Sequence, residues 1–229
     1  MKAIAAVLDR INGVRPFAET KPLRLATVEL ASPGIDELLV KIEAAGLCHS
    51  DLSVINGDRP RPLPMAIGHE AVATVIEAGD TAAKQFAAGD RIVMSFLPPC
   101  GICRECQSGE GYMCPNGAAA NGRGTLLSGD IRIKDCGQEV HHHLGASAFA
   151  SHAVIDRRSA VKIPADVPVE IAALFGCAVL TGVGAVLNTA ALRAGESVII
   201  YGLGGVGLDR AFADTRVVGG LQGGGHGPA

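Results

Sequence analysis

The chain has 229 residues, and 48% of them are hydrophobic, so there is enough apolar side chain to bury a sizeable core. A formal net charge of −3 and the absence of tryptophan give no reason to expect a nucleic-acid partner or a base-stacking surface. The cysteine count is seven, an odd number, and the first residues lack a secretory cleavage pattern. We therefore expect a reducing, cytoplasmic compartment in which thiols bind metal or take part in catalysis.

Short apolar runs rich in β-branched residues fill most of the first 165 residues, and proline and glycine separate them. This punctuation predicts short strands joined by loops. A short helix is expected directly after Cys48, ending at Gly57. The pattern as a whole predicts a β-barrel or sandwich with inserted loops. The expected strands are residues 2–8, 24–30, 37–45, 70–78, 90–96 and 149–163.

Four cysteines fall within fifteen residues in the pattern C-x2-C-x2-C-x7-C. Four thiolates in one loop can close a tetrahedral zinc site that has no open position for a substrate. The loop, about residues 98–116, is therefore predicted to hold structure and to do no chemistry. Its four ligands are Cys100, Cys103, Cys106 and Cys114.

Cys48, His69 and Cys177 are zinc-ligand types that lie far apart in the sequence. Open zinc sites commonly draw their ligands from several elements, and two cysteines with one histidine leave a fourth position for water or substrate. The alternative is that both cysteines are small buried residues and the histidine belongs to the core. Three adjacent histidines, 141–143, are not expected to converge on one ion, because neighbouring strand residues point in different directions.

The character of the chain changes after Pro168. Residues 168–191 read as helical, and the uncharged run 171–192 is long enough to span a membrane. Its many alanines, glycines and threonines, and the lack of a flanking basic cluster, favour a buried helix and no membrane partner. Residues 196–201 (ESVIIY) then read as a buried strand. A glycine-rich turn follows and includes Gly202, Gly204, Gly205 and Gly207.

A strand, a glycine-rich turn and a helix start form the first unit of a dinucleotide-binding fold, although the turn could also be a plain loop. The continuation of that fold is missing: only a weak helical stub, 208–214, is expected, and no acidic residue lies ~20 residues past the glycines. We expect a truncated or frame-shifted end. The predicted domains are 1–165, a partial dinucleotide-binding domain at 166–214 and a disordered, aberrant tail at 215–229.

Six segments together resemble the zinc-dependent medium-chain alcohol dehydrogenase family, and they occur in the family's order. The resemblance implies an α+β chain: a GroES-like β-barrel catalytic domain followed by an incomplete α/β Rossmann domain. It also implies two zinc ions, a catalytic ion on Cys48, His69 and Cys177 and a structural ion on the four-cysteine loop. The matching segments are 45–51, 68–70, 100–114, 141–156, 175–186 and 202–207.

Further roles follow from the same resemblance. Asp51 matches a residue that hydrogen-bonds the zinc-bound histidine, as ligating imidazoles generally require. Glu70 matches a carboxylate that can approach the zinc. His49 matches a position that contacts the cofactor pyrophosphate; without the resemblance it reads as a solvated residue at a helix start. Ser50 matches the hydroxyl that passes the substrate proton towards solvent, and Ser53 replaces the histidine that extends this relay in many members.

The implied reaction is the oxidation of a primary or secondary alcohol to an aldehyde or ketone. Zinc lowers the pKa of the alcohol, and hydride passes to a nicotinamide cofactor, NAD(H) in preference to NADP(H). The expected partner is a small alcohol or aldehyde, and full-length relatives are expected to be homo-oligomers. The alternatives are a non-catalytic zinc-binding fragment of such an enzyme and, in a third class, a redox-sensing zinc protein whose thiolates oxidise.

Overall fold

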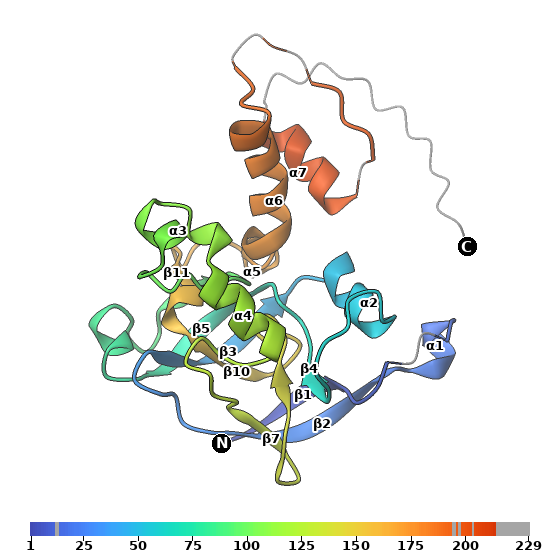
Figure 1. The fold of residues 1–229 in the computed structure, drawn as a ribbon, viewed down its shortest axis with the longest axis vertical. Coiled ribbons are helices and arrows are strands. Elements are labelled where there is room, and N and C mark those ends of the chain that lie inside the picture. The colour runs from blue at the N-terminus through green and yellow to red at the C-terminus, as the bar shows by residue number, and fades with distance from the viewer. Residues whose placement is uncertain (12–13, 194–195, 197, 203, 214–229) are drawn as a thin grey trace. The chain divides into compact units, whose positions relative to one another are not determined.

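The computed structural model describes residues 1–11, 14–193, 196, 198–202 and 204–213 (Figure 1). The chain divides into two compact units, Met1–Gly176 and Cys177–Ala229. Each unit is described on its own below. The predicted disordered tail, 215–229, lies outside the described residues.

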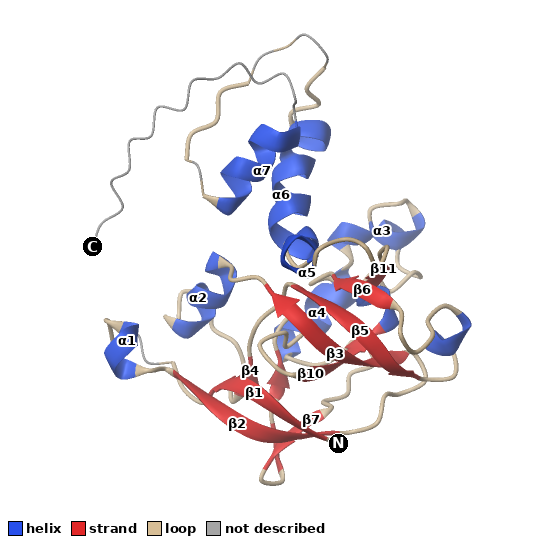
Figure 2. Ribbon diagram, turned by 180° about the vertical axis from the view of Figure 1, so that it is seen from behind, coloured by secondary structure: helices blue, strands red, loops and turns tan. Residues whose placement is uncertain are grey.

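Two β-sheets form the first unit (Figure 2). One has the strand order β8-β7-β2-β1-β4-β9 and the other has the order β10-β3-β5-β6-β11. The first sheet contains β1 (Lys2–Leu8), β2 (Leu23–Leu30), β4 (Met65–Ala66), β7 (Ile133–Asp135), β8 (Gln138–Glu139) and β9 (His141–His142). The second contains β3 (Glu37–Ala45), β5 (Ala71–Ala78), β6 (Arg91–Met94), β10 (His152–Asp156) and β11 (Ala160–Lys162).

Strand pairing is antiparallel throughout these two sheets except between β4 and β9, which run parallel. In that pair Met65 lies opposite His141 and Ala66 opposite His142. Parallel strands leave a sheet at the same end. The residues after β4 and the residues after β9 therefore emerge side by side, which matters for the site described below.

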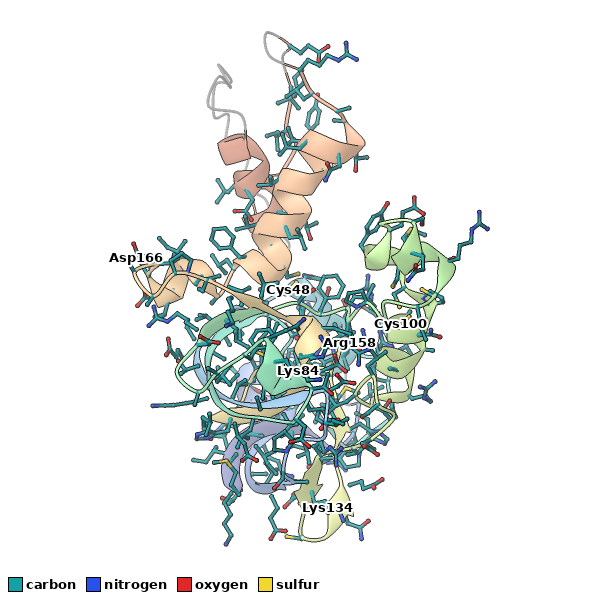
Figure 3. The ribbon with its side chains drawn as sticks, turned by 90° about the vertical axis from the view of Figure 1, so that its left-hand side faces the viewer. Cys48, Lys84, Cys100, Lys134, Arg158 and Asp166 are labelled. Carbon is teal, nitrogen blue, oxygen red and sulfur yellow. The ribbon has the colours of Figure 1, made fainter. Side chains whose placement is uncertain are left out.

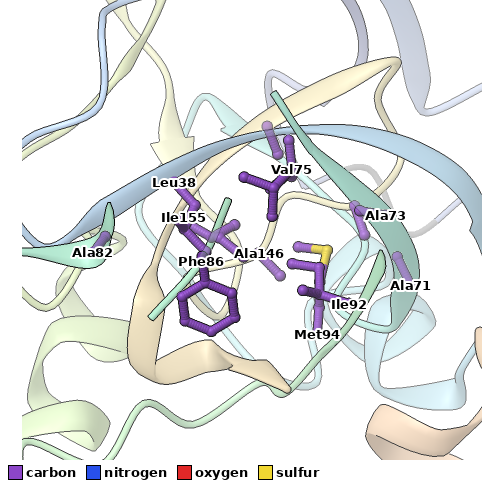
Figure 4. Close-up of a cluster of buried hydrophobic side chains, with 13 residues drawn as sticks. Leu38, Ala71, Ala73, Val75, Ala82, Phe86, Ile92, Met94, Ala146 and Ile155 are labelled. Carbon is purple, nitrogen blue, oxygen red and sulfur yellow. The ribbon is translucent and has the colours of Figure 1, made fainter. Parts of the chain in front are cut away.

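The core of the first unit follows the two-residue period of its strands. Leu38 and Val40 of β3 contribute to one buried cluster, which also contains Phe86 and Ile92 (Figure 4). Leu39, between them in sequence, belongs to a second cluster that includes Ala3 and other β1 residues. Since successive side chains of a strand point to opposite faces, both faces of β3 are buried.

Short helices complete the first unit, and the expected helix after Cys48 is confirmed as α2. Gly57, where the helix was expected to end, has φ +89°, a conformation that favours glycine. The helices are α1 (Phe17–Thr20), α2 (His49–Ile55), α3 (Arg104–Gln107), α4 (Pro115–Arg123) and α5 (Val169–Ala172), with 3₁₀ turns η1 (Ala82–Lys84), η2 (Gly111–Met113) and η3 (Arg157–Ser159).

The uncharged run expected to be a buried helix does form a helix, Val169–Thr189, but it is mostly exposed. Its most apolar window has a mean hydropathy of 2.0, is 33% buried, and meets the length and composition requirements for crossing a membrane. Within the second unit, α6 packs against α7, and this leaves Leu180 and Leu187 more than half exposed. Its parts past α5 are the π-helical η4 (Phe175–Val179), α6 (Leu180–Gly184) and the π-helical η5 (Ala185–Thr189).

The prediction of a strand at 196–201 is wrong for the residues that the structure describes in that range. Residues 198–202 adopt no strand, and Ile199 and Tyr201 are exposed. A single extended segment has nothing to pair with among the described residues of this unit, and an unpaired strand is not stable in water. The helix after the glycines, α7 (Gly205–Ala213), begins three residues before the predicted stub at 208.

Candidate metal and active sites

The four-cysteine loop brings its sulfurs together. The Sγ atoms of Cys100, Cys103, Cys106 and Cys114 all lie within 4.8 Å of one another. Two of the separations are 4.0 Å, between Cys100 and Cys106, and 3.9 Å, between Cys103 and Cys114. A tetrahedral zinc ion with Zn–S bonds of ~2.3 Å needs sulfurs about 3.8 Å apart. The donor set therefore fits one closed zinc site, and the structure has no disulfide among these cysteines.

Hydrogen bonds favour the thiolate form of one of these sulfurs, that of Cys100. Cys100 Sγ accepts from the backbone N–H of Cys103 at 3.4 Å and from Asn116 Nδ2 at 3.2 Å. A backbone N–H at Ile102, the side chain of Asn116 and the N–H at Cys103 lower the pKa of the Cys100 thiol to about 6. Donors that point at a sulfur favour its charged form, which is the form that binds metal.

Helix α4 fastens this loop to the sheet. Cys114 Sγ caps α4 by accepting from the N–H of Gly117 at 3.3 Å. A Cβ on Gly117 would lie 2.3 Å from the carbonyl oxygen of Pro98, so the helix approaches the 97–98 backbone more closely than any side chain would permit. One turn on, the buried Asn121 donates from Nδ2 to the carbonyl oxygen of Phe96 at 2.8 Å.

A second set of candidate residues begins at the N-terminus of α2. Cys48 is the N-cap of α2, and Asp51 closes a capping box by accepting from the N–H of Cys48 at 3.2 Å. This local geometry places Cys48, His49 and Ser50 at the start of the helix, where His49 is exposed and the other two are half-buried, while Asp51 is buried. Ser53 donates its hydroxyl to the carbonyl oxygen of His49 at 3.0 Å, so its hydroxyl is occupied within the helix.

His69 reaches the same place from the other side of the barrel. Its ring is buried, and Nδ1 lies 2.8 Å from Oδ1 of Asp51. A hydrogen on Nδ1 leaves Nε2 with its lone pair available for a metal. Gly68 has φ +93°, and a Cβ on it would lie 2.4 Å from the backbone nitrogen of Phe149. Glycine is therefore required directly before this histidine.

Glu70 lies beside a second required glycine. A Cβ on Gly46 would lie 2.5 Å from Oε1 of Glu70, so the missing side chain makes room for the carboxylate. The two segments are also joined through the backbone, since the N–H of Gly46 donates to the carbonyl oxygen of Glu70 at 3.0 Å. The buried Glu70 thus lies between the ends of β3 and β5, next in sequence to His69.

The donor atoms of Cys48 and His69 lie within 4.8 Å of each other. Bonds of ~2.3 Å to sulfur and ~2.1 Å to nitrogen put two tetrahedral ligands of one zinc ion about 3.6 Å apart, a separation that this limit allows, so the pair is compatible with a shared ion. Cys48 directly precedes α2, whereas Cys100 lies in the loop between β6 and α3 (Figure 3). Cys177 is the first residue of the second unit; it follows Gly176, which belongs to the first unit and whose Cβ would lie 2.0 Å from the carbonyl oxygen of Met94.

His143 joins this site, which the sequence did not predict. Its Nδ1 lies 3.3 Å from Oδ1 of Asp51, and its ring meets the ring of His69 edge to face, with centroids 5.6 Å apart. Burial alone would raise the pKa of Asp51, but hydrogen bonding to His143 and His69 outweighs it and lowers this pKa to about 2. Asp51 therefore stays ionised.

The other two adjacent histidines do not take part. His142 is fully buried, and its Nε2 accepts from the backbone N–H of Arg132 at 3.1 Å; burial lowers its pKa to about 3. His141 is half-buried. The expectation that the three adjacent histidines would not converge on one ion is thus met, because His141 and His142 are absent from the group formed by Asp51, His69 and His143. The third is brought to Asp51 by the parallel pairing of β4 and β9, a long-range contact with no signal in local sequence.

The glycine-rich turn is described within the second unit. Gly202 has φ +87°, and a Cβ on Gly207 would lie 1.9 Å from the carbonyl oxygen of Gly202, so both positions require glycine. Gly204 and Gly205 face open space, and Gly205 begins α7. A glycine turn at a helix N-terminus presents backbone N–H groups to an anion such as a pyrophosphate.

Comparison with known proteins identifies the barrel. Residues 34–165 match the alcohol dehydrogenase GroES-like domain family. The chain belongs to the zinc-dependent medium-chain alcohol dehydrogenase family. The resemblance noted from six sequence segments and the predicted fold class are both confirmed. Members of this family are oxidoreductases that depend on zinc and NAD(P).

Individual relatives agree with this assignment. The chain is 37% identical to S-(hydroxymethyl)glutathione dehydrogenase of Synechocystis over 209 residues, 91% of this chain and 54% of the relative. It is 38% identical to putative alcohol dehydrogenase D of Mycobacterium tuberculosis over 215 residues, 94% and 56% of the two chains. A zinc-binding alcohol dehydrogenase domain protein of Burkholderia ambifaria has a similar structure, with TM-score 0.84, 35% identity and coverage of 93% and 55%. The chain spans about half the length of these relatives.

Proposed function

We propose that this chain carries the catalytic metal site of an alcohol dehydrogenase that oxidises a primary or secondary alcohol and transfers hydride to a nicotinamide cofactor, NAD(H) in preference to NADP(H). The observation that carries the proposal is the buried pair of Asp51 and His69, 2.8 Å apart, beside Cys48. A carboxylate behind an imidazole that faces a thiol is the usual support of a catalytic zinc ligand.

Two zinc ions are proposed, each with a different task. The four sulfurs of the 98–116 loop would hold a structural ion. Cys48, His69 and Cys177 would hold a catalytic ion and leave one position open. When bound there, zinc acts as a Lewis acid that lowers the pKa of an alcohol hydroxyl.

The remaining tasks belong to the protein. Asp51 fixes the tautomer of His69, so that the hydrogen stays on Nδ1. Ser50, at the start of α2, is the proposed acceptor that passes the alcohol proton towards solvent, and water must continue the relay because the Ser53 hydroxyl is held by the His49 carbonyl. Glu70 is the proposed carboxylate neighbour of the ion. His49 and the turn glycines Gly202, Gly204, Gly205 and Gly207 are proposed to contact the cofactor pyrophosphate.

Activity can be tested directly. The full chain, loaded with zinc, is mixed with a high concentration of NAD and a primary alcohol, and NADH is followed by its absorbance. We expect a rate above that of the Cys48→Ala variant and two zinc ions per chain by metal analysis. A rate equal to that of the variant would reject the dehydrogenase proposal for this chain.

A second candidate is a non-catalytic zinc-binding protein of the same family. It is favoured by the four clustered sulfurs of the 98–116 loop, which can close a zinc site with no position for a substrate. In that case the four-thiolate site still fills with zinc, while NADH formation stays at the level of the Cys48→Ala variant. Metal content and NADH formation, measured on the same sample, separate the two candidates.

A further inference from the structure

His143 is placed at the site by sheet topology. It directly follows β9, which runs parallel to β4, and His69 is the third residue after β4. The backbone N–H of His143 donates to the carbonyl oxygen of Ala66 at 3.3 Å and to Oγ of Ser147 at 3.2 Å. Only 1% of His143 is exposed. The N–H of His143 is thus held by two acceptors, and its ring is enclosed by its surroundings.

Asp51 Oδ1 is the polar atom that this ring faces. Nδ1 of His143 lies 3.3 Å from Oδ1, which is long for a hydrogen bond, and it is buried with no other partner among the described residues. A buried N–H without an acceptor is unfavourable. Polar contacts in ligand-free sites are often long and shorten when the ligand binds. A carboxylate oxygen has two lone pairs, so Oδ1 can accept from His69 and His143 together.

His69 has two ring contacts in addition to the contact at Nδ1. The ring of Phe96 meets it edge to face with centroids 6.0 Å apart, and the ring of His143 does so at 5.6 Å. The orientation of a metal-binding imidazole depends on groups of this kind, and changing them typically weakens metal binding about 10–100-fold.

We propose that His143 is a positioning residue of the catalytic metal site, which donates from Nδ1 to Asp51 and thereby holds Asp51 and His69 in the geometry that binds the ion. The inference rests on the proposed function, because it assumes that His69 and Cys48 bind a metal. His143 touches neither substrate nor cofactor in this role. It acts through Asp51.

The test measures metal binding, not turnover. The zinc-loaded full chain is dialysed against a chelator that empties the open site and leaves the four-thiolate site filled. Co²⁺ is then titrated in, and its visible d–d spectrum gives both affinity and coordination geometry. His143→Phe keeps a ring against His69 and removes the donor, whereas His143→Asn keeps an N–H near the position of Nδ1 and removes the ring.

We expect His143→Phe to weaken Co²⁺ binding about tenfold and to change the d–d bands, and His143→Asn to recover at least half of the lost affinity on a logarithmic scale. The matched control is His142→Phe, the same change at a buried imidazole that contacts Arg132 and is absent from the Asp51 group. We expect this control to lower thermal stability but to keep the Co²⁺ affinity of the wild type.

Each other outcome is decisive. Wild-type affinity in His143→Phe, or equal losses in His143→Phe and His142→Phe, would overturn the positioning role. Co²⁺ binding that survives in Cys48→Ala would overturn the proposed open site itself, and with it this inference. A loss in Cys48→Ala combined with no loss in His143→Phe rejects the role of His143 alone.

Discussion

The two candidate metal sites of this chain are built in opposite ways. The four-thiolate site takes all its ligands from fifteen consecutive residues, and its sulfurs already lie at nearly tetrahedral separations. The site around His69 draws on α2, the segment after β4, and the segment after β9. The first site depends on a loop and the ion it binds, whereas the second depends on the whole barrel.

The largest expected effect is a loss of local structure in the 98–116 loop when one of its cysteines is replaced. Cys106→Ser should remove the metal from the 98–116 loop and expose its backbone amides, because a structural zinc site supplies much of the folding free energy of its own segment. The amides of β3 and β5, two strands that contribute to the same buried apolar cluster, should stay protected. Hydrogen exchange with mass spectrometry measures both regions at once.

The control for this experiment is Cys136→Ser, which alters an exposed cysteine outside both sites. Its exchange pattern should match that of the wild type. If Cys106→Ser also unprotects β3 and β5, the loop is not an independent folding element and the contrast between the two sites breaks down.

A pair of glycines tests how strongly the second site depends on the barrel. Gly68 and Gly89 both have φ +93°, but a Cβ on Gly68 would lie 2.4 Å from the nitrogen of Phe149, while nothing lies within 4 Å of one on Gly89. Gly89→Ala should cost ~1–2 kcal/mol for the left-handed backbone alone. Gly68→Ala should cost about 3 kcal/mol or more, because the backbone of Phe149 must also shift.

Urea unfolding of the two variants gives the difference between them. That difference isolates the close approach of the His69 segment to the 149 backbone, since the backbone angle is the same. Equal losses of stability would mean that the backbone at Phe149 shifts at little cost to admit a side chain at Gly68, and that the barrel does not fix His69 as described.

The third prediction uses the pH dependence of stability to test the burial of His142. The pKa of His142 is lowered from 6.5 to about 3 in the folded chain, chiefly by burial, so below pH 6.5 the unfolded chain binds the proton first. Stability from this group is therefore complete above pH 6.5 and is lost as the pH falls. At pH 5, 1.5 units below the ordinary pKa, the loss should be ~2 kcal/mol.

His142→Gln removes this titration while keeping an atom that can accept from the N–H of Arg132. We expect the free energy of unfolding of the variant to change less between pH 7 and pH 5 than that of the wild type, by up to ~2 kcal/mol. Denaturant unfolding at the two pH values measures it. An equal change in the free energy of unfolding between pH 7 and pH 5 in both proteins would contradict the lowered pKa of His142.

The smallest predicted effect concerns helix α4. Gly122 lies on the exposed side of this helix with nothing within 4 Å of a Cβ, so alanine fits there without strain. Gly122→Ala should stabilise the helix by up to ~1 kcal/mol because alanine has the higher helix propensity. Gly117→Ala, on the same helix, should instead destabilise it, since its Cβ would meet the Pro98 carbonyl oxygen. Thermal unfolding of the two variants should therefore shift in opposite directions.

Local features of the structure could be predicted from sequence. Strand β1 has the predicted limits, residues 2–8, because apolar residues and a following polar loop define both ends. The clustering of the four sulfurs in the 98–116 loop was predicted from cysteine spacing, and α2 from the residues between Cys48 and Gly57. In each case the signal lies within a few neighbouring residues.

Features that depend on distant partners were predicted less well. His143 was missed because only the β4–β9 register places it beside Asp51. The segment 196–201 has the apolar, β-branched composition of a strand, yet a strand also needs neighbours, and the described part of its unit supplies none. The helix at Val169–Thr189 was expected to be buried for the same reason: composition indicates what could be covered but not what covers it.

The hydrogen bond from Asn121 to the Phe96 carbonyl connects the four-cysteine loop to the imidazole of His69. Cys114 starts α4, α4 carries Asn121, Asn121 holds Phe96, and the Phe96 ring rests against His69. The loop therefore also helps to position the Phe96 ring against His69. A chimaera that imports this loop from a relative would have to bring a matching amide at 121, or the Phe96 ring would lose the bond that holds its backbone beside His69.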